Sequence, residues 1–208
     1  MTQDPAGILV VGIGEVEAPP DRMTIDLAIS PRAASVGEAA GIAASKTTRL
    51  LETLAGMGVD ESNVRTSRFS VYPEYDHRDG GPRLLGYRVT NSLRVTTNDL
   101  DGAGALIDAA AQVGGDDLTV DNVAYTVGDD TALRQQARET AWEKARAQAE
   151  HLASLAGRRL GPVLSVVERT GGEPGPMMRV AAMAEASTPV APGTSTVRVI
   201  LETRFGLD

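Results

Sequence analysis

Alternation of apolar and polar side chains predicts several half-buried strands along the chain. In residues 22–32, Met23, Ile25, Leu27 and Ile29 alternate with polar or small residues, which is the period of a strand with one buried face. The alternation stops near Pro31. The same reasoning predicts further strands over residues 8–18, 63–75, 87–95, 118–127, 160–169 and 195–205.

Helical spacing separates these strands at three places. Ser35 and Glu38 have the spacing of a capping box, and apolar residues recur at helical intervals from there to Gly58. A second helix is predicted from Leu100 to Val113, capped by Asn98 or Asp99 and ended by a glycine pair.

The third and longest helix is predicted over residues 130–157. On one side of this helix a small or apolar residue recurs every four positions, which forms a stripe of Leu133, Ala137, Ala141, Ala145, Ala149 and Ala153. A narrow stripe of small side chains lets a helix lie close to a sheet or to another helix. We expect this stripe to pack in the core.

The order of these elements predicts an α+β fold. Strand, helix and strand follow one another over residues 22–75 and again over residues 87–127, which suggests a loose internal repeat. The long alanine-rich helix and two closing strands complete the chain. We expect an antiparallel sheet with packed helices in one domain, residues 1–208, with its core in residues 7–207.

The glycine pair Gly12 and Gly14 follows an apolar strand and raises the question of a dinucleotide-binding turn. That turn needs a third glycine three residues later and a helix whose N-terminus faces the pyrophosphate. Glu17 occupies the required position, and Pro19 and Pro20 prevent a helix from starting there. We expect a strand in which the glycines permit a bulge or a close approach of backbone.

Composition excludes several classes of function. The net charge of −8 argues against a nucleic-acid partner, because phosphate binding needs clustered Lys and Arg. The chain has no cysteine, so disulfides and thiolate chemistry are excluded. No stretch approaches a transmembrane span, and the opening residues lack a secretory leader. We therefore expect a cytoplasmic protein.

Candidate catalytic or metal-binding residues are few. His77 is flanked by Asp76 and Asp79, but adjacent side chains in a turn rarely converge on one ion, and His151 lies on the long helix. No serine elbow or phosphate loop is present. We expect no catalytic residues, no metal and no cofactor. A small-ligand or enzyme site built from distant residues such as Arg88, Asp121 and Tyr125 is a less favoured alternative.

Residues 171–194 form the longest segment without predicted structure. The segment is rich in Gly, Pro and Ala, which favours a flexible connector. Its methionines, Met177, Met178 and Met183, could instead present a soft surface to a protein partner or react with oxidants.

Several stretches, taken in order, resemble the SIMPL domain family, formerly DUF541. They are "VVGIGEVEAPPDRMTIDLAIS", "GVDESNVRTSRFSVYPEY", "GYRVTNSLRVTTNDLDGAGALIDAAAQVGG", the alanine-rich "ALRQQARETAWEKARAQAEHLASLAGRRLG" and "TPVAPGTSTVRVILETRFGL". Each stretch is weak alone, but their order and spacing from about Gly7 to Leu207 make the set specific.

The resemblance implies a mixed fold and homo-oligomers that are ring-like or channel-like in some bacterial relatives. It also implies an association with defence against oxidative stress, in proteins that are often periplasmic or outer-membrane immunogens. An animal member binds a kinase in inflammatory signalling, and no catalytic residues are established for the family. Relatives commonly carry a signal peptide, which this sequence lacks.

These expectations leave two main hypotheses for function. The first is a non-enzymatic assembly protein whose homo-oligomer supports oxidative or envelope stress tolerance by scaffolding or shielding other molecules. The second is an adaptor that docks a protein partner through residues 171–194.

Overall fold

The computed structural model describes residues 7–76, 81–169 and 193–208, and it confirms the α+β class. The chain divides into two compact units. The described residues of unit 1 are 7–20, 127–169 and 193–208, and those of unit 2 are 21–76 and 81–126. This division does not test the expectation of a single domain, which stays a prediction.

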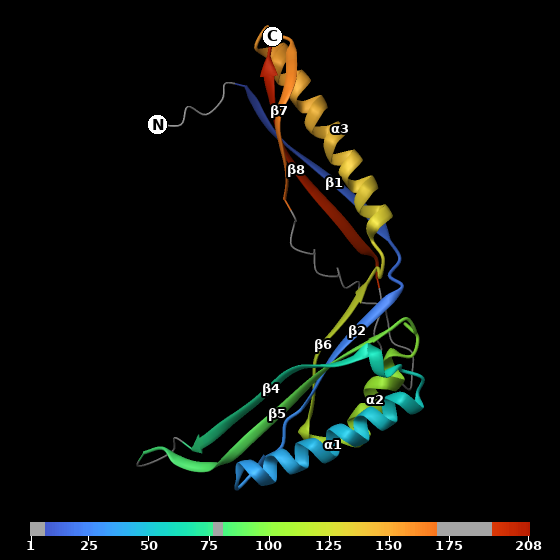
Figure 1. Cartoon of the computed structure of the whole chain (residues 1–208), viewed down its shortest axis with the longest axis vertical. Helices are drawn as coiled ribbons and strands as arrows, with labels where there is room; N and C mark the ends of the chain where they lie inside the picture. Colours follow the sequence, from blue (N-terminus) through green and yellow to red (C-terminus); the bar gives the residue numbers. More distant parts are fainter. Residues whose placement is uncertain (1–6, 77–80, 170–192) are drawn as a thin grey trace. The chain divides into compact units, whose positions relative to one another are not determined.

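Unit 1 is a three-stranded antiparallel sheet with one long helix on it (Figure 1). The strand order is β1-β8-β7, with bounds β1 Ile8–Ala18, β8 Ser195–Leu207 and β7 Leu160–Arg169. Helix α3, Thr131–Leu155, packs against β1 and β8. The helix lies within the predicted range, and the alanines of its predicted stripe, at positions 137, 141, 145, 149 and 153, are all buried.

The two glycines of β1 explain how closely the helix approaches the strand. A Cβ atom at Gly14 would overlap the carbonyl oxygen of Ala137, and one at Gly12 would overlap that of Ala141. A helix of small side chains thus rests on a strand without side chains at these two positions. The expectation of a close backbone approach is confirmed.

Larger side chains fill the core of unit 1 on either side of this contact. Val10 and Phe205 pack with the alanines of α3, and Trp142 of the same helix contacts Phe205 with ring centroids 6.0 Å apart. Val199 and Leu201 of β8 form the neighbouring cluster.

Unit 2 contains both predicted strand-helix-strand repeats. The first is β2 Arg22–Ile29, α1 Val36–Gly56 and β4 Val64–Asp76; the second is β5 Arg83–Thr97, α2 Ala103–Gly114 and β6 Leu118–Thr126. Short elements join them: strand β3, Arg32–Ala33, and two 3-10 turns, Glu61–Asn63 and Gly115–Asp117.

The sheet of unit 2 is antiparallel and interleaves the two repeats. Its order is β3-β5-β2-β6, and β4 pairs with the other edge of β5 (Figure 1). The buried face carries Met23, Ile25 and Leu27, which pack against leucines of both helices. As predicted, apolar and polar residues of β5 lie on opposite faces.

The helix boundaries of unit 2 agree with the sequence signals at α1 and depart from them at α2. The Ser35 hydroxyl accepts a hydrogen bond from the Glu38 amide at 3.2 Å, as the capping box requires. The predicted start at Leu100 is wrong, because α2 begins at Ala103. The Asp99 carboxylate accepts a hydrogen bond from the Gly102 amide, so residues 99–102 form a turn ahead of the helix.

Candidate functional site

In the described residues, one face of the unit 1 sheet has no helix on it, and this face mixes apolar with charged side chains. The side chains of β1 that point away from α3 are Leu9, Val11, Ile13, Glu15 and Glu17, of which Leu9 is 49% and Val11 48% exposed. In the register of the sheet Ile13 pairs with Ile200 of β8. We call this the open face of unit 1.

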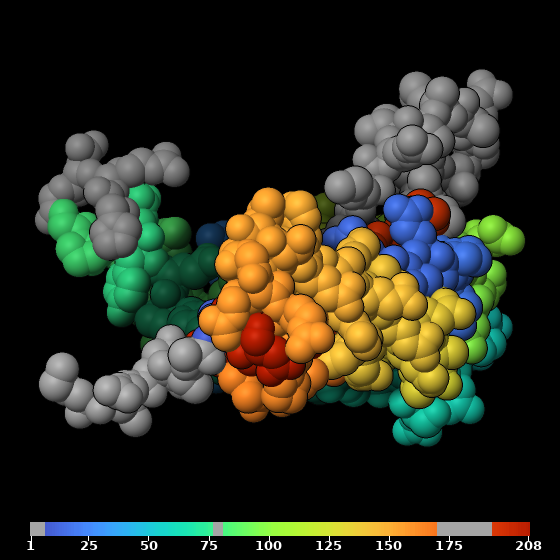
Figure 2. Space-filling model, turned by 90° about the horizontal axis from the view of Figure 1, so that it is seen from above, coloured from blue at the N-terminus to red at the C-terminus, as the bar shows by residue number. Residues whose placement is uncertain are grey.

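Strand β7 is the apolar edge of the same sheet. Val163, Leu164, Val166 and Val167 are each 44–48% exposed. One edge of β7 pairs with β8, and among residues 7–76, 81–169 and 193–208 no strand pairs with the other edge. Seen end-on, the orange atoms of β7 and the end of α3 surround the red end of β8 (Figure 2).

An apolar edge strand is rarely left bare in a soluble protein. Edges are normally blunted by charges, prolines, bulges or covering elements. In β7, Pro162 and two register irregularities lie between Leu160 and Ser165, and Glu168 and Arg169 at the end of the strand pair with Arg138 and Glu202. The regular part of β7 from Ser165 to Val167 carries none of these devices and therefore has the character of a strand that pairs with another strand.

The β4–β5 hairpin of unit 2 is a second exposed apolar region. Phe69 is 59% and Tyr72 61% exposed, and Tyr75, Leu84 and Leu85 are also exposed. Phe69 shares a face with the core, but β4 is an edge strand that neither helix of unit 2 covers in the described residues.

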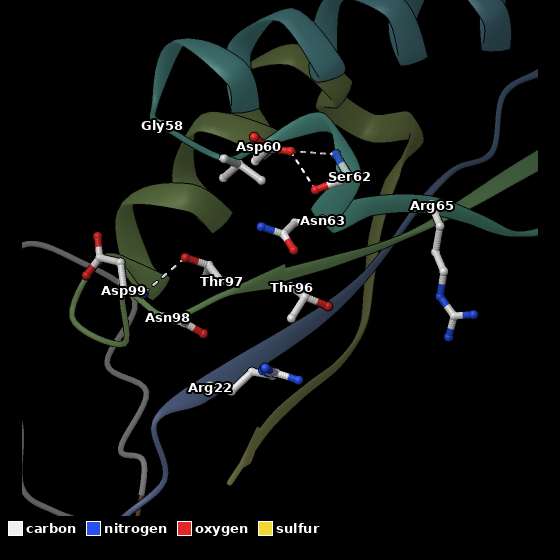
Figure 3. Close-up of a pocket in the computed structure, with 11 residues that line it drawn as sticks. Arg22, Gly58, Asp60, Ser62, Asn63, Arg65, Thr96, Thr97, Asn98 and Asp99 are labelled. Carbon is white, nitrogen blue, oxygen red and sulfur yellow. Dashed lines mark hydrogen bonds between the residues drawn. The ribbon is translucent and has the colours of Figure 1, made fainter. Parts of the chain in front are cut away.

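One hollow of the described surface is polar and lies in unit 2 (Figure 3). Its volume is about 620 Å³, and Arg22, Arg65, Asn63 and Thr96 supply hydrogen-bonding groups to its lining. The Asp60 carboxylate accepts hydrogen bonds from the hydroxyl and the amide of Ser62, which lower its pKa. Asp60 thus caps a 3-10 turn and is not poised for acid catalysis.

A second hollow of about 470 Å³ shares Arg65 with the first. In it, Arg94 donates two hydrogen bonds to Asp26, at 2.6 and 2.9 Å. The hydrogen bond from Arg94 is the main cause that lowers the pKa of Asp26. Arg94 and Asp26 therefore form a bidentate ion pair, and the lining is rich in hydrogen-bond donors.

The perturbed carboxylates elsewhere follow the same direction. A hydrogen bond from Arg88 lowers the pKa of Glu74, and one from Arg138 lowers the pKa of Glu168. A general acid at neutral pH needs a carboxyl whose pKa is raised. The arrangement stabilises charged carboxylates in ion pairs, as a structural network does.

The structure does not bring Arg88, Asp121 and Tyr125 together. Arg88 donates to Glu74 and to the Ser30 carbonyl, and Asp121 lines the second hollow. Tyr125 lies in the core cluster on the other side of the sheet, where burial raises the pKa of its phenol. The alternative site proposed from these three residues is therefore not formed.

Other sequence candidates fall outside the described residues or lie apart. Met177, Met178 and Met183, like His77, are not among the described residues, so the partner surface stays a prediction. His151 is exposed on α3. Within the described residues no three metal-binding side chains converge.

Sequence reasoning missed the exposed edge of β7. The signal was the run of apolar residues interrupted only by Ser165, which lacks the strict alternation of a half-buried strand. Such a run indicates that both faces of a strand contact other groups, and here α3 contacts β7 only slightly.

Comparison with known proteins identifies the family of this chain. The family model SIMPL, described as "Protein of unknown function (DUF541)", matches residues 8–205. The "Uncharacterized protein YggE" of Escherichia coli K12 is 29% identical over 174 residues, covering 83% of this chain and 70% of the relative. The "26 kDa periplasmic immunogenic protein" of Brucella melitensis is 29% identical over 220 residues, covering 99% and 86%.

These relatives bear on location as well. The Brucella relative is named as periplasmic, so the expected cytoplasmic location finds no support there. In the described part of the chain no helix combines the length and apolar character needed to cross a membrane. Since the family model matches both units almost from end to end, the chain belongs to the SIMPL family.

Proposed function

We propose that this protein is a non-enzymatic SIMPL-family member that works as a homo-oligomer, assembled through β7 and the open face of unit 1. The assembly supports oxidative or envelope stress tolerance by scaffolding or shielding other molecules. The single observation that carries the proposal is the exposed apolar edge of β7.

The sheet of unit 1 provides the physical reason for assembly. Edge-to-edge pairing of β7 with a strand of another copy satisfies backbone amides and carbonyls and removes its apolar side chains from water. Leu9 and Val11 lie on β1 at the opposite edge of the sheet, separated from β7 by Arg204 and Glu202 of β8, and they add a smaller apolar area to the open face. A closed arrangement of copies also removes the exposed edge that invites aggregation.

The non-enzymatic part of the proposal is supported by chemistry and by family. The carboxylates with displaced pKa values are all more acidic than usual and are held by arginines or turn amides. The family model carries no reaction in its description. The stress role is supported by the resemblance to bacterial members associated with oxidative-stress defence.

The native mass of the purified protein over a range of concentrations tests the proposal. We expect a discrete multiple of 21.8 kDa that resists dilution. Val167→Lys places a charge in the middle of the edge strand and is expected to reduce the mass to that of a monomer. Light scattering coupled to size-exclusion chromatography measures both.

A matched variant separates assembly from charge. Gln148→Lys adds the same charge at an exposed position of α3 and is expected to leave the oligomer intact. A wild-type protein that stays at 21.8 kDa at all concentrations contradicts the proposal. An oligomer that survives Val167→Lys rejects β7 as the assembly surface.

A further inference from the structure

A row of charged side chains crosses the face of the unit 2 sheet that lies opposite its two helices. In this row Arg65 of β4 lies directly opposite Arg94 of β5, which in turn lies opposite Asp26 of β2. Like charges placed opposite each other on a sheet destabilise the pairing. We call this surface the open face of unit 2, and its arginine row needs a compensating negative charge.

A bulge in β4 adds another arginine to the same place. In a regular strand, residues three apart point to opposite faces. The register shifts between Thr66 and Arg68, which changes this pattern. Arg68 pairs with Ser92, two residues from Arg94 on β5, so Arg68 and Arg65 lie on one face. Bulges that redirect side chains are frequent next to active sites.

The one nearby carboxylate in the row is already engaged. Asp26 accepts two hydrogen bonds from Arg94 and a further one from the Asn122 side chain, and it attracts Arg65 more weakly. Among the ion pairs of the described residues none includes Arg65 or Arg68. Arg88, further along β5, is instead paired with Glu74. Two guanidinium groups thus stand on a sheet face without a close ion pair, although Asp26 attracts Arg65 at longer range.

The groups around these two arginines are donors of the kind that hold an oxyanion. The hollow of about 470 Å³ is lined by Arg65, Arg68 and Arg94, by Thr66, Ser67 and Ser92, and by Asp26 and Asp121. Guanidinium groups bind phosphate through two parallel hydrogen bonds, and hydroxyls add further donors. Asp121 also lines the hollow, and its negative charge repels an anion. Removing this charge by mutation should therefore strengthen anion binding.

We propose that Arg65 and Arg68, with the hydroxyls beside them, bind the phosphate group of a small molecule. A phosphate carries about −1.5 to −2 charges at neutral pH, which matches two guanidinium groups that form no close ion pair. The hollow adjoins the larger one through Arg65, which leaves room for the rest of a phosphate ester. This site is separate from the assembly surface of unit 1.

Calorimetric titration with inorganic phosphate and with glycerol phosphate tests the site, against sodium chloride of equal ionic strength. We expect both phosphates to bind and chloride not to. Replacing Arg65 or Arg68 by Ala removes charge-assisted hydrogen bonds and should weaken binding about tenfold or more. Arg65→Lys keeps the charge and should recover part of the loss.

Two further variants make the result specific. Asp121→Asn removes the opposing charge and should tighten binding several-fold. Arg49→Ala, at an exposed position of α1, should change nothing. Tighter binding of glycerol phosphate than of inorganic phosphate identifies an ester as the ligand, and the reverse order identifies the free ion.

Equal heats with phosphate and chloride overturn the proposal. So does a loss with Arg49→Ala as large as that with Arg65→Ala, because binding then reflects general charge. Side-chain Nε–H resonances of the arginines give a second readout: phosphate should shift those of Arg65 and Arg68 and leave that of Arg49 in place. Circular dichroism confirms that each variant is folded.

Discussion

The sheets of the two units differ in what their open faces show to water. On the open face of unit 1, the side chains of β1 are apolar at Leu9, Val11 and Ile13 and charged at Glu15 and Glu17. On the open face of unit 2, the corresponding side chains of β2 are Thr24 and Asp26, beside the hydroxyls and arginines of β5. An antiparallel sheet in water needs one apolar face to pack against its helices. Apolar side chains on the second face therefore indicate a further partner, and polar ones indicate contact with water.

Cross-strand polar pairs satisfy much of the open face of unit 2 outside Arg65 and Arg68. Asp26 pairs with Arg94, and the hydroxyls of Ser30 and Thr90 lie 2.7 Å apart. The open face of unit 1 also has ion pairs, such as Arg169 with Glu202, but apolar side chains remain between them. We infer that unit 2 tolerates water on this face and that unit 1 is built for a protein partner.

The largest effect is expected from disrupting the covered face of unit 1. Gly14→Ala places a Cβ against the Ala137 carbonyl, so α3 must move away from β1. We expect a loss of about 3 kcal/mol in the free energy of unfolding. The only tryptophan, Trp142, lies in this unit, and all four tyrosines lie in unit 2, so tryptophan fluorescence during urea unfolding reports unit 1.

A glycine outside the contact provides the control. A Cβ at Gly37 of α1 meets nothing within 4 Å, and Gly37→Ala should stabilise the helix by about 0.5 kcal/mol. If Gly14→Ala unfolds at the same urea concentration as the wild type, α3 does not lie as close to β1 as described.

A smaller effect is expected from breaking the ion pair on the open face of unit 2. Asp26→Asn leaves Arg94 opposite Arg65 without a carboxylate and should cost about 1–2 kcal/mol at neutral pH. The folded-state pKa of Asp26 lies below its ordinary value of 3.8, so its contribution is present above that value and is lost as pH falls through the folded pKa.

Urea unfolding of the wild type and of Asp26→Asn, at neutral pH and again below the folded pKa, measures this contribution. The difference between them should shrink in acid. Glu52→Gln, at an exposed position of α1, should show no such difference at either pH. A gap between wild type and Asp26→Asn that stays constant with pH would show that the ion pair does not contribute to stability.

The smallest effect on stability is expected from exchanging side chains between the two open faces. Val11→Thr makes unit 1 resemble unit 2 and, at a position 48% exposed, should change stability by less than about 0.5 kcal/mol. It should nevertheless weaken the oligomer, which light scattering detects as a lower mass on dilution. The reverse exchange, Thr24→Val, should leave the mass unchanged. If the two variants have equal masses on dilution, the two open faces do not differ in their role in assembly.

Much of the fold could be read from local patterns. The Ser35 cap, the alternation in β5 and the alanine stripe of α3 are signals confined to a few neighbouring residues, and all are confirmed. The predicted start of α2 was wrong because an aspartate such as Asp99 can cap a turn as readily as a helix. Which of the two it caps depends on how α2 packs on the sheet.

The candidate sites depended on information that no local pattern holds. Arg65 and Arg68 are three residues apart, which predicts opposite faces, and only the bulge in β4 places them together. Strand β7 is exposed because the single helix α3 covers β1 and β8 and is too narrow to cover much of β7. Both features arise from tertiary pairing.

The contact between Gly14 and α3 has a consequence for how this sequence can drift over evolutionary time. A crowded pair of side chains can change together, one growing as the other shrinks. Gly14 faces the backbone of Ala137 and Ala141, which every amino acid shares, so no replacement in the helix can make room for a larger residue. In homologous sequences with this contact, the position should stay glycine while showing no covariation with any position of the helix.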